Sequence, residues 1–123
     1  MVKSSGLNHI NLNVSDVQRS LRFYQEAFGL EVKFWEGKRM VFLGSPGARD
    51  VITLCEVDES QPIGSGGVSH FGFALAGTTG LDESVRQVER AGGRLLRRGE
   101  HAPGVPYAYF VDPDGYVIEI GNL

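Results

Sequence analysis

Residues 7–29, LNHINLNVSDVQRSLRFYQEAFG, decide the fold because they describe a strand followed directly by a helix. Apolar and polar residues alternate through residues 7–14, which predicts a half-buried strand. Ser15 and Asp16 are candidates for the helix cap, and apolar residues then recur at helical spacing. The pattern stops at Gly29, a residue that commonly ends a helix. The stretch therefore predicts a strand, a cap and an amphipathic helix.

The same order of elements occurs twice along the chain. Three more strands are predicted after the first helix, at residues 30–35, 39–44 and 50–57. Residues 58–67 are polar and rich in Gly, Ser and Pro, as linkers are. A second strand-helix unit then begins, followed by three strands, at residues 68–75, 81–93, 94–100, 107–112 and 115–122. The sequence therefore predicts a single α+β domain over residues 1–123, with one β-α-β-β-β module at about 6–57 and another at about 68–121.

Superposing the two modules places two histidines at equivalent positions. His9 is the third residue of its opening strand segment, and His70 is the third residue of the other. At the far end of each module, Val-Ile-Thr ending at Thr53 aligns with Val-Ile-Glu ending at Glu119. Two imidazoles and one carboxylate thus occupy corresponding points of the repeat.

The alternation of side chains along a strand places these three residues on one kind of face. His9, His70 and Glu119 each lie opposite the bulky apolar residues that a helix would cover. If the sheet curls, the three side chains point into one space. Two nitrogen ligands and one oxygen ligand suit a divalent ion of Fe, Mn, Ni, Co or Zn, with coordination positions left open. The sequence therefore predicts a metal site at His9, His70 and Glu119.

Composition excludes several other classes of function. The net charge is −3, with 12 Lys and Arg against 15 Asp and Glu, and no basic run exceeds two residues, so no nucleic-acid partner is predicted. No apolar stretch approaches the roughly 18–20 residues needed to span a bilayer, so no membrane partner is predicted. Cys55 is the only cysteine, which fits a reducing, cytoplasmic location.

Three motifs resemble one known family. They are LNHINLNVSDVQRSLRFYQEAFGLEV, VSHFGFAL and YFVDPDGYVIEI. Over about residues 6–121 the chain resembles the vicinal oxygen chelate superfamily, also called the glyoxalase/bleomycin-resistance/dioxygenase family. The resemblance implies paired modules that form a curled, eight-stranded mixed sheet around a divalent metal, often in a homodimer. His9, His70 and Glu119 match the ligand positions of that family.

Departures from the family pattern bear on the reaction. Glyoxalases have a fourth ligand acid where this chain has Thr53, which disfavours glyoxalase chemistry. Fosfomycin-resistance enzymes share a tyrosine matched by Tyr109, but they also use an arginine beyond the ligand acid, and this chain has none after Glu119. Extradiol-type dioxygenase chemistry on a small molecule with two vicinal oxygens is therefore slightly favoured. Fosfomycin-type or glyoxalase-type transferase or lyase chemistry is one alternative, and non-catalytic drug binding is another.

Further side chains are predicted to serve the site. Tyr109 is expected to act in catalysis beside Glu119 by orienting substrate or relaying a proton. The residues expected to contact substrate lie on the same faces as the metal ligands and are Asn11, Thr53, Tyr107 and Tyr109.

Two features are predicted to have no role in the site. His101 lies in the Pro- and Gly-containing segment GEHAPG and is expected to be a solvated loop residue. Asp112, Asp114 and Gly115 are expected to form a turn and nothing more.

Overall fold

The computed structural model describes residues 1–76 and 80–122, and the predicted repeat is confirmed. The first module contains β1 (Ile10–Val14), α1 (Val17–Phe28), β2 (Glu31–Glu36), β3 (Met40–Gly44) and β4 (Ile52–Glu56). The second contains β5 (Phe71–Ala74), α2 (Leu81–Arg90), β6 (Arg94–Ala102), β7 (Val105–Val111) and β8 (Val117–Gly121). Neither of these helices is long and apolar enough to cross a bilayer.

Each module forms its own four-stranded sheet. The strand orders are β1-β4-β3-β2 and β5-β8-β7-β6, and in each sheet the opening strand runs parallel to the last strand of the module. The eight strands of the α+β prediction are confirmed, but within the described residues they pair as two sheets instead of one continuous sheet. β1 and β5 are edge strands of their sheets. A hollow of about 240 Å³ is lined by residues of both strands and by residues 64–68.

The ends of α1 follow the predicted signals. The Asp16 side chain accepts a hydrogen bond from the Arg19 backbone N–H at 3.0 Å, which caps the first turn. Gly29 has φ 65° and its N–H bonds to the carbonyl of Gln25, so the helix ends in the left-handed conformation that glycine adopts without strain. One face of the helix is buried in the core through Val17, Ser20, Leu21, Phe23, Tyr24 and Ala27.

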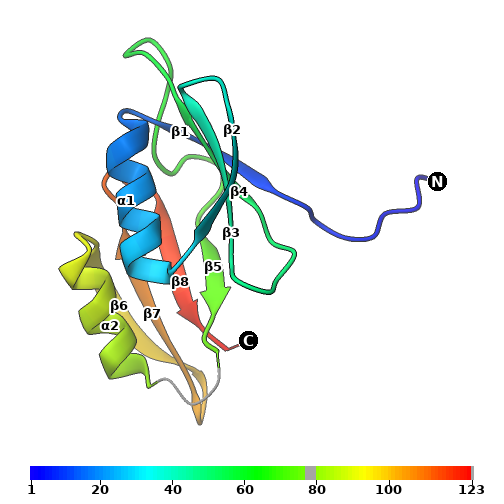
Figure 1. Cartoon of the computed structure of the whole chain (residues 1–123). Coiled ribbons are helices and arrows are strands. Elements are labelled where there is room, and N and C mark those ends of the chain that lie inside the picture. The colour runs from blue at the N-terminus through cyan, green and yellow to red at the C-terminus, as the bar shows by residue number, and fades with distance from the viewer. Residues whose placement is uncertain (77–79, 123) are drawn as a thin grey trace.

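The modules join through their helices. α1 and α2 lie side by side along one side of the strands, while the residues before β1 extend away from the body of the molecule (Figure 1). The rings of Phe28 and Phe73 stack across the junction with centroids 4.4 Å apart. The carboxyl end of α1 therefore makes an apolar contact with the second module.

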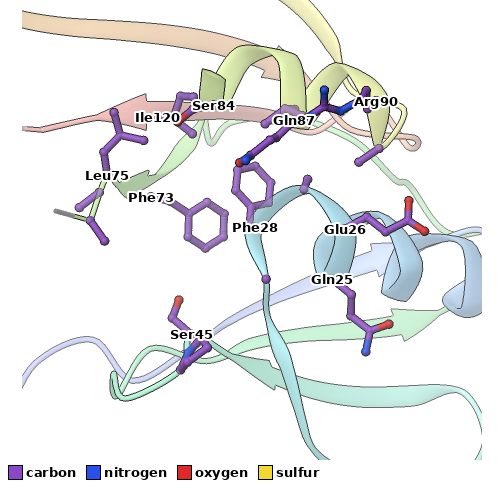
Figure 2. A pocket seen from close by; sticks show the side chains of 17 residues that line it. Gln25, Glu26, Phe28, Ser45, Phe73, Leu75, Ser84, Gln87, Arg90 and Ile120 are labelled. Carbon is purple, nitrogen blue, oxygen red and sulfur yellow. The ribbon is translucent and has the colours of Figure 1, made fainter. Parts of the chain in front are cut away.

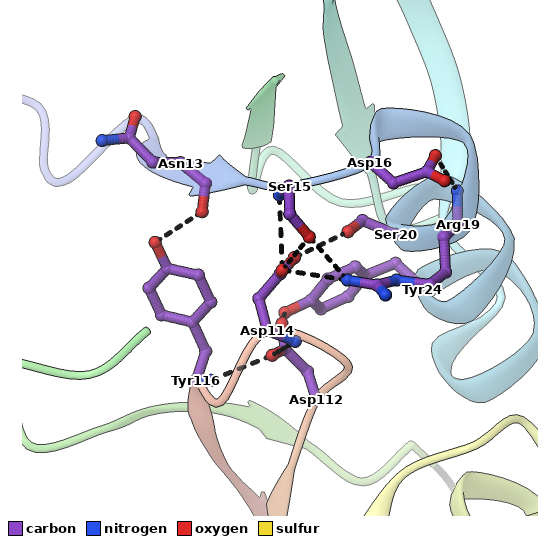
Figure 3. A network of polar contacts seen from close by, with 9 residues as sticks. All are labelled: Asn13, Ser15, Asp16, Arg19, Ser20, Tyr24, Asp112, Asp114 and Tyr116. Atoms are coloured by element: carbon purple, nitrogen blue, oxygen red, sulfur yellow. Dashed lines mark hydrogen bonds and ion pairs between the residues drawn. The ribbon is translucent and has the colours of Figure 1, made fainter. Parts of the chain in front are cut away.

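A buried polar contact also joins the modules (Figure 3). The Tyr24 hydroxyl donates to Asp112 Oδ2 at 2.6 Å. Asp112 Oδ1 accepts from the backbone N–H groups of Asp114 and Tyr116, both at 2.9 Å. The predicted turn is thus present. Its first residue, Asp112, also forms a hydrogen bond with Tyr24 of α1.

The next carboxylate of the turn extends this contact (Figure 3). Asp114 accepts hydrogen bonds from the Ser15 hydroxyl at 2.6 Å and the Ser20 hydroxyl at 3.1 Å, and Arg19 forms an ion pair with it at 3.0 Å. The expectation that these residues form only a turn was wrong, because both carboxylates bind side chains of the other module.

Candidate metal centre

Glu119 is a buried carboxylate in the middle of β8. It pairs with Gly72 on one side and with Tyr109 on the other, and its exposed fraction is 7%. Its neighbours Ile118 and Ile120 lie in the hydrophobic core, so the predicted alternation of faces is confirmed. A carboxylate buried at this depth requires compensating partners, since isolated buried charges are strongly unfavourable.

His70 supplies the first of these partners. It lies immediately before β5, and its Nε2 atom is 3.2 Å from Glu119 Oε2. The Ser69 hydroxyl lies 3.0 Å from His70 Nδ1, which holds the ring with Nε2 facing the carboxylate. Tyr109 packs its ring edge-on against His70 with centroids 4.9 Å apart and is only 8% exposed. The structure therefore brings together three of the residues that the sequence assigns to the site.

His101 supplies a second partner that the sequence prediction missed. It lies in β6, not in a loop, and its Nε2 atom is 2.5 Å from Glu119 Oε1. Its ring stacks on Tyr107 with centroids 4.3 Å apart. Alternation along β6 could not reveal it, because the register with β7 shifts between Glu100 and Ala102.

His9 lies apart from this cluster. It is exposed, directly precedes β1, and contacts the side-chain oxygen of Asn8 through Nδ1. His9 lines a hollow of about 170 Å³, whereas His70 and Glu119 line another of about 340 Å³, and both hollows include residues 71–73. Across residues 1–76 and 80–122, no three His, Cys, Asp or Glu side chains of the single chain are grouped closely enough to hold an ion.

The equivalent position in the first module has a hydroxyl without a partner. Thr53 pairs with Asn11 in the same way that Glu119 pairs with Gly72. Thr53 is 2% exposed, and no hydrogen-bond partner is present for its Oγ1 atom. An unpaired buried hydroxyl costs about 1–3 kcal/mol, so a bound group that reached it would remove this cost.

A cation lies against the tyrosines of the second module. The Arg97 guanidinium carbon is 4.9 Å from the ring centre of Tyr109 and 5.9 Å from that of Tyr107. None of the ion pairs among the described residues includes Arg97. The second module thus presents a positive charge against the rings of Tyr107 and Tyr109.

A separate groove lies between the helices and β5 (Figure 2). It has a volume of about 840 Å³, and Phe28 and Phe73 lie within it. Polar residues at its margin include Gln25, Glu26 and Gln87. Its lining contains none of the predicted site residues, so it is not part of the candidate centre.

Gly72 allows the backbone of β5 to pack closely against Glu119 in β8. A Cβ atom at this position would stand 2.9 Å from the Glu119 carbonyl oxygen and 3.3 Å from its Cβ. Because backbone cannot yield cheaply, we expect Gly72→Ala to lower the free energy of unfolding by about 1–3 kcal/mol in urea titrations. Gly66→Ala is the control, since a Cβ there meets nothing within 4 Å. Equal stability of the two variants would contradict the tight packing of β5 on β8.

Comparison with known proteins agrees with this architecture. The chain is 30% identical to an uncharacterized protein of Pseudomonas aeruginosa, over 94% of this chain and 87% of that one. It is 28% identical to a glutathione transferase FosA of Serratia marcescens, over 95% of this chain and 82% of the relative.

Solved structures show the same fold. A mutant of the fosfomycin resistance protein FosX of Listeria monocytogenes, in complex with Mn(II) and 1S,2S-dihydroxypropylphosphonic acid, superposes with a TM-score of 0.78 at 25% identity. The match covers 97% of this chain and 90% of that one. Residues 6–120 also match the family described as the Glyoxalase/Bleomycin resistance protein/Dioxygenase superfamily. The chain belongs to this superfamily.

Proposed function

We propose that this protein is a metal-dependent enzyme that binds a small molecule through two vicinal oxygens. Its ion would be held by His9, His70 and Glu119. The observation that carries the proposal is the buried Glu119 carboxylate, which faces the Nε2 atom of His70 at 3.2 Å. A carboxylate and an imidazole in contact on neighbouring strands are a usual basis for a transition-metal site.

The residues fit such an ion chemically. Imidazole nitrogen and carboxylate oxygen suit Fe, Mn, Ni, Co or Zn. A divalent ion at this place would act as a Lewis acid on the oxygens of the substrate. Mn(II) is a suitable probe, because the similar FosX structure is a complex with this ion.

The surrounding residues have distinct proposed roles. Tyr109, packed against His70, orients the substrate or relays a proton through its hydroxyl. Tyr107 lies 5.1 Å from Tyr109, ring centre to ring centre, and would contact the substrate beside it. Thr53, with its unpaired hydroxyl, and Asn11 on the neighbouring strand would contact the substrate from the first module.

Among the possible reactions we favour addition of a nucleophile, such as a thiol, to an anionic small molecule. The similarity to glutathione transferase FosA supports this choice, and Arg97 supplies a positive charge beside the two tyrosines. Extradiol-type ring cleavage is the second candidate, because Thr53 leaves the ligand set without a fourth acid. Mn(II)-dependent formation of a covalent adduct between a thiol and an anionic electrophile would support the first reaction, and cleavage of a catechol by dioxygen with Fe(II) the second.

We further propose that the enzyme is a homodimer in which His9 comes from the second copy. His9 is exposed and is not grouped with His70 and Glu119 of its own chain, which supports completion of the site across an interface. Light scattering tests the dimer, and a monomer would rule out this arrangement.

Subunit complementation tests the origin of His9. His9→Ala and His70→Ala homodimers each lack one ligand in every site and are expected to bind Mn(II) poorly. When equal amounts are unfolded and refolded together, half the dimers contain both variants, and each has one intact site if His9 crosses the interface. We therefore expect recovery of about a quarter of the wild-type sites. No recovery, with the dimers shown to have exchanged, would place all three ligands in one chain.

Measurements of metal binding and of turnover distinguish an enzyme from a protein that only binds its ligand. Saturable Mn(II) binding, followed by loss of turnover in Tyr109→Phe with the metal retained, would support the enzyme. Tight binding of an aromatic drug by protein that takes up no divalent metal would instead indicate a bleomycin-resistance type of function.

A further inference from the structure

We propose that His101 is a positioning residue that orients the Glu119 carboxylate toward the metal. Its Nε2–H donates to Glu119 Oε1, which leaves Oε2 beside His70 as the oxygen available to the ion. This inference rests on the proposed function, since it assumes that Glu119 and His70 hold the ion.

The two oxygens of Glu119 have different partners. Oε1 lies 2.5 Å from His101 Nε2, and Oε2 lies 3.2 Å from His70 Nε2. The contact with His101 is the closer of the two, and a hydrogen bond to an ionised carboxylate is stronger than one between neutral groups. A carboxylate held in this way would offer a single oxygen to the ion and leave room for a chelating substrate.

The surroundings of His101 fix its ring. Tyr107 stacks against it with an interplanar angle of 29°, although His101 is exposed and the register of β6 with β7 shifts there, between Glu100 and Ala102. Gly99 makes this stacking possible, because a Cβ atom there would stand 2.6 Å from the Tyr107 hydroxyl. A stacked imidazole is suited to orienting a ligand, because the stacking restricts the ring before it forms the hydrogen bond.

A ligand role for His101 is less consistent with the geometry. His70 and His101 contact opposite oxygens of one carboxylate, so an ion held by Oε2 and His70 would lie on the far side of the carboxylate from His101. The experiment must therefore separate a residue that acts through Glu119 from one that binds the ion itself.

Mn(II) titrations followed by electron paramagnetic resonance provide the test. Loss of the hydrogen bond in His101→Ala is expected to weaken Mn(II) binding by about 10–100-fold, as is usual for residues that orient metal ligands. His101→Gln can place an amide N–H near the position of Nε2 and is expected to restore most of this loss. Glu100→Gln, an exposed change in the same strand, is the control and should bind as the wild type does.

Two spectroscopic readouts distinguish positioning from ligation and from a structural role. Pulsed electron paramagnetic resonance should count the same number of imidazole ligands in His101→Ala as in the wild type. Nitrogen-detected NMR of the metal-free protein should show a proton on His101 Nε2, with a shift that changes in Glu119→Gln.

Each contrary result has a separate meaning. Absence of Mn(II) binding by folded wild-type protein would overturn the proposed function, and the role of His101 with it. Undiminished binding by His101→Ala, or a His101 Nε2 without a proton, would overturn the positioning role alone. Loss of one imidazole ligand in His101→Ala would show that His101 is itself a ligand and would likewise overturn it.

Discussion

Replacing Glu119 by glutamine is expected to weaken Mn(II) binding by more than about 100-fold, because even residues that only orient a ligand contribute 10–100-fold. The amide keeps the shape of the carboxylate but lacks its charge and one acceptor oxygen. Because Glu119 is buried against two imidazoles, the neutral side chain should be accommodated without loss of the fold. Isothermal titration calorimetry with Mn(II) measures the change, and circular dichroism monitors the fold.

Glu56→Gln is the matched control for this experiment. Glu56 ends β4, the strand equivalent to β8, but its side chain faces Arg39 at 3.8 Å and is not part of the centre. Its substitution should leave Mn(II) affinity unchanged. If Glu119→Gln bound Mn(II) as tightly as Glu56→Gln, Glu119 would not be a ligand.

Replacing Asp112 by alanine is expected to lower the free energy of unfolding by about 3 kcal/mol, because it leaves one buried hydroxyl and two backbone N–H groups without an acceptor. Asp112 is 5% exposed and accepts from Tyr24 across the junction of the modules. Burial raises the pKa of Asp112, and burial and then the Asp112 charge raise the pKa of Tyr24. Asp112→Asn should be milder, since the amide oxygen can still accept from the backbone.

Denaturant titrations check this prediction against an exposed aspartate with a similar local role. Asp50 accepts from the backbone and hydroxyl of Ser45 at 3.0 and 2.6 Å, but it is exposed, so Asp50→Ala should cost less than about 1 kcal/mol. A double-mutant cycle of Asp112→Ala with Tyr24→Phe should give a coupling of at least about 1 kcal/mol. Additive effects would mean that the contact between the modules does not stabilise the fold.

The faces of the strands and the order of elements within each module could be predicted from the sequence. Apolar and polar residues alternate along a strand and so reveal its buried face. Because the module occurs twice, each position can also be compared with its equivalent in the other copy. That is why the relation between Glu119 and Thr53, inferred by aligning the modules, reappears in the register of β8 with β5 and of β4 with β1. Local signals also marked the ends of α1, with Asp16 as one of two cap candidates and Gly29 as the stop.

Contacts that depend on how the elements pack could not be predicted in the same way. His101 was missed because β6 extends past Gly99 and shifts register near its end, which the Pro-Gly segment concealed. The buried contact of Tyr24 with Asp112 joins residues 88 positions apart, and neither has a local signal for it. In the proposed dimer the place of His9 is set by contacts between two copies, about which a sequence repeat has no information.

Anomalous diffraction from wild-type crystals soaked in manganese chloride tests the central claim most directly. The account predicts a manganese peak within bonding distance of His70 Nε2 and Glu119 Oε2, with His9 of a second copy as the third protein ligand and His101 on the other carboxylate oxygen. A well-ordered structure with no peak beside Glu119, or with manganese bound only elsewhere, would contradict it.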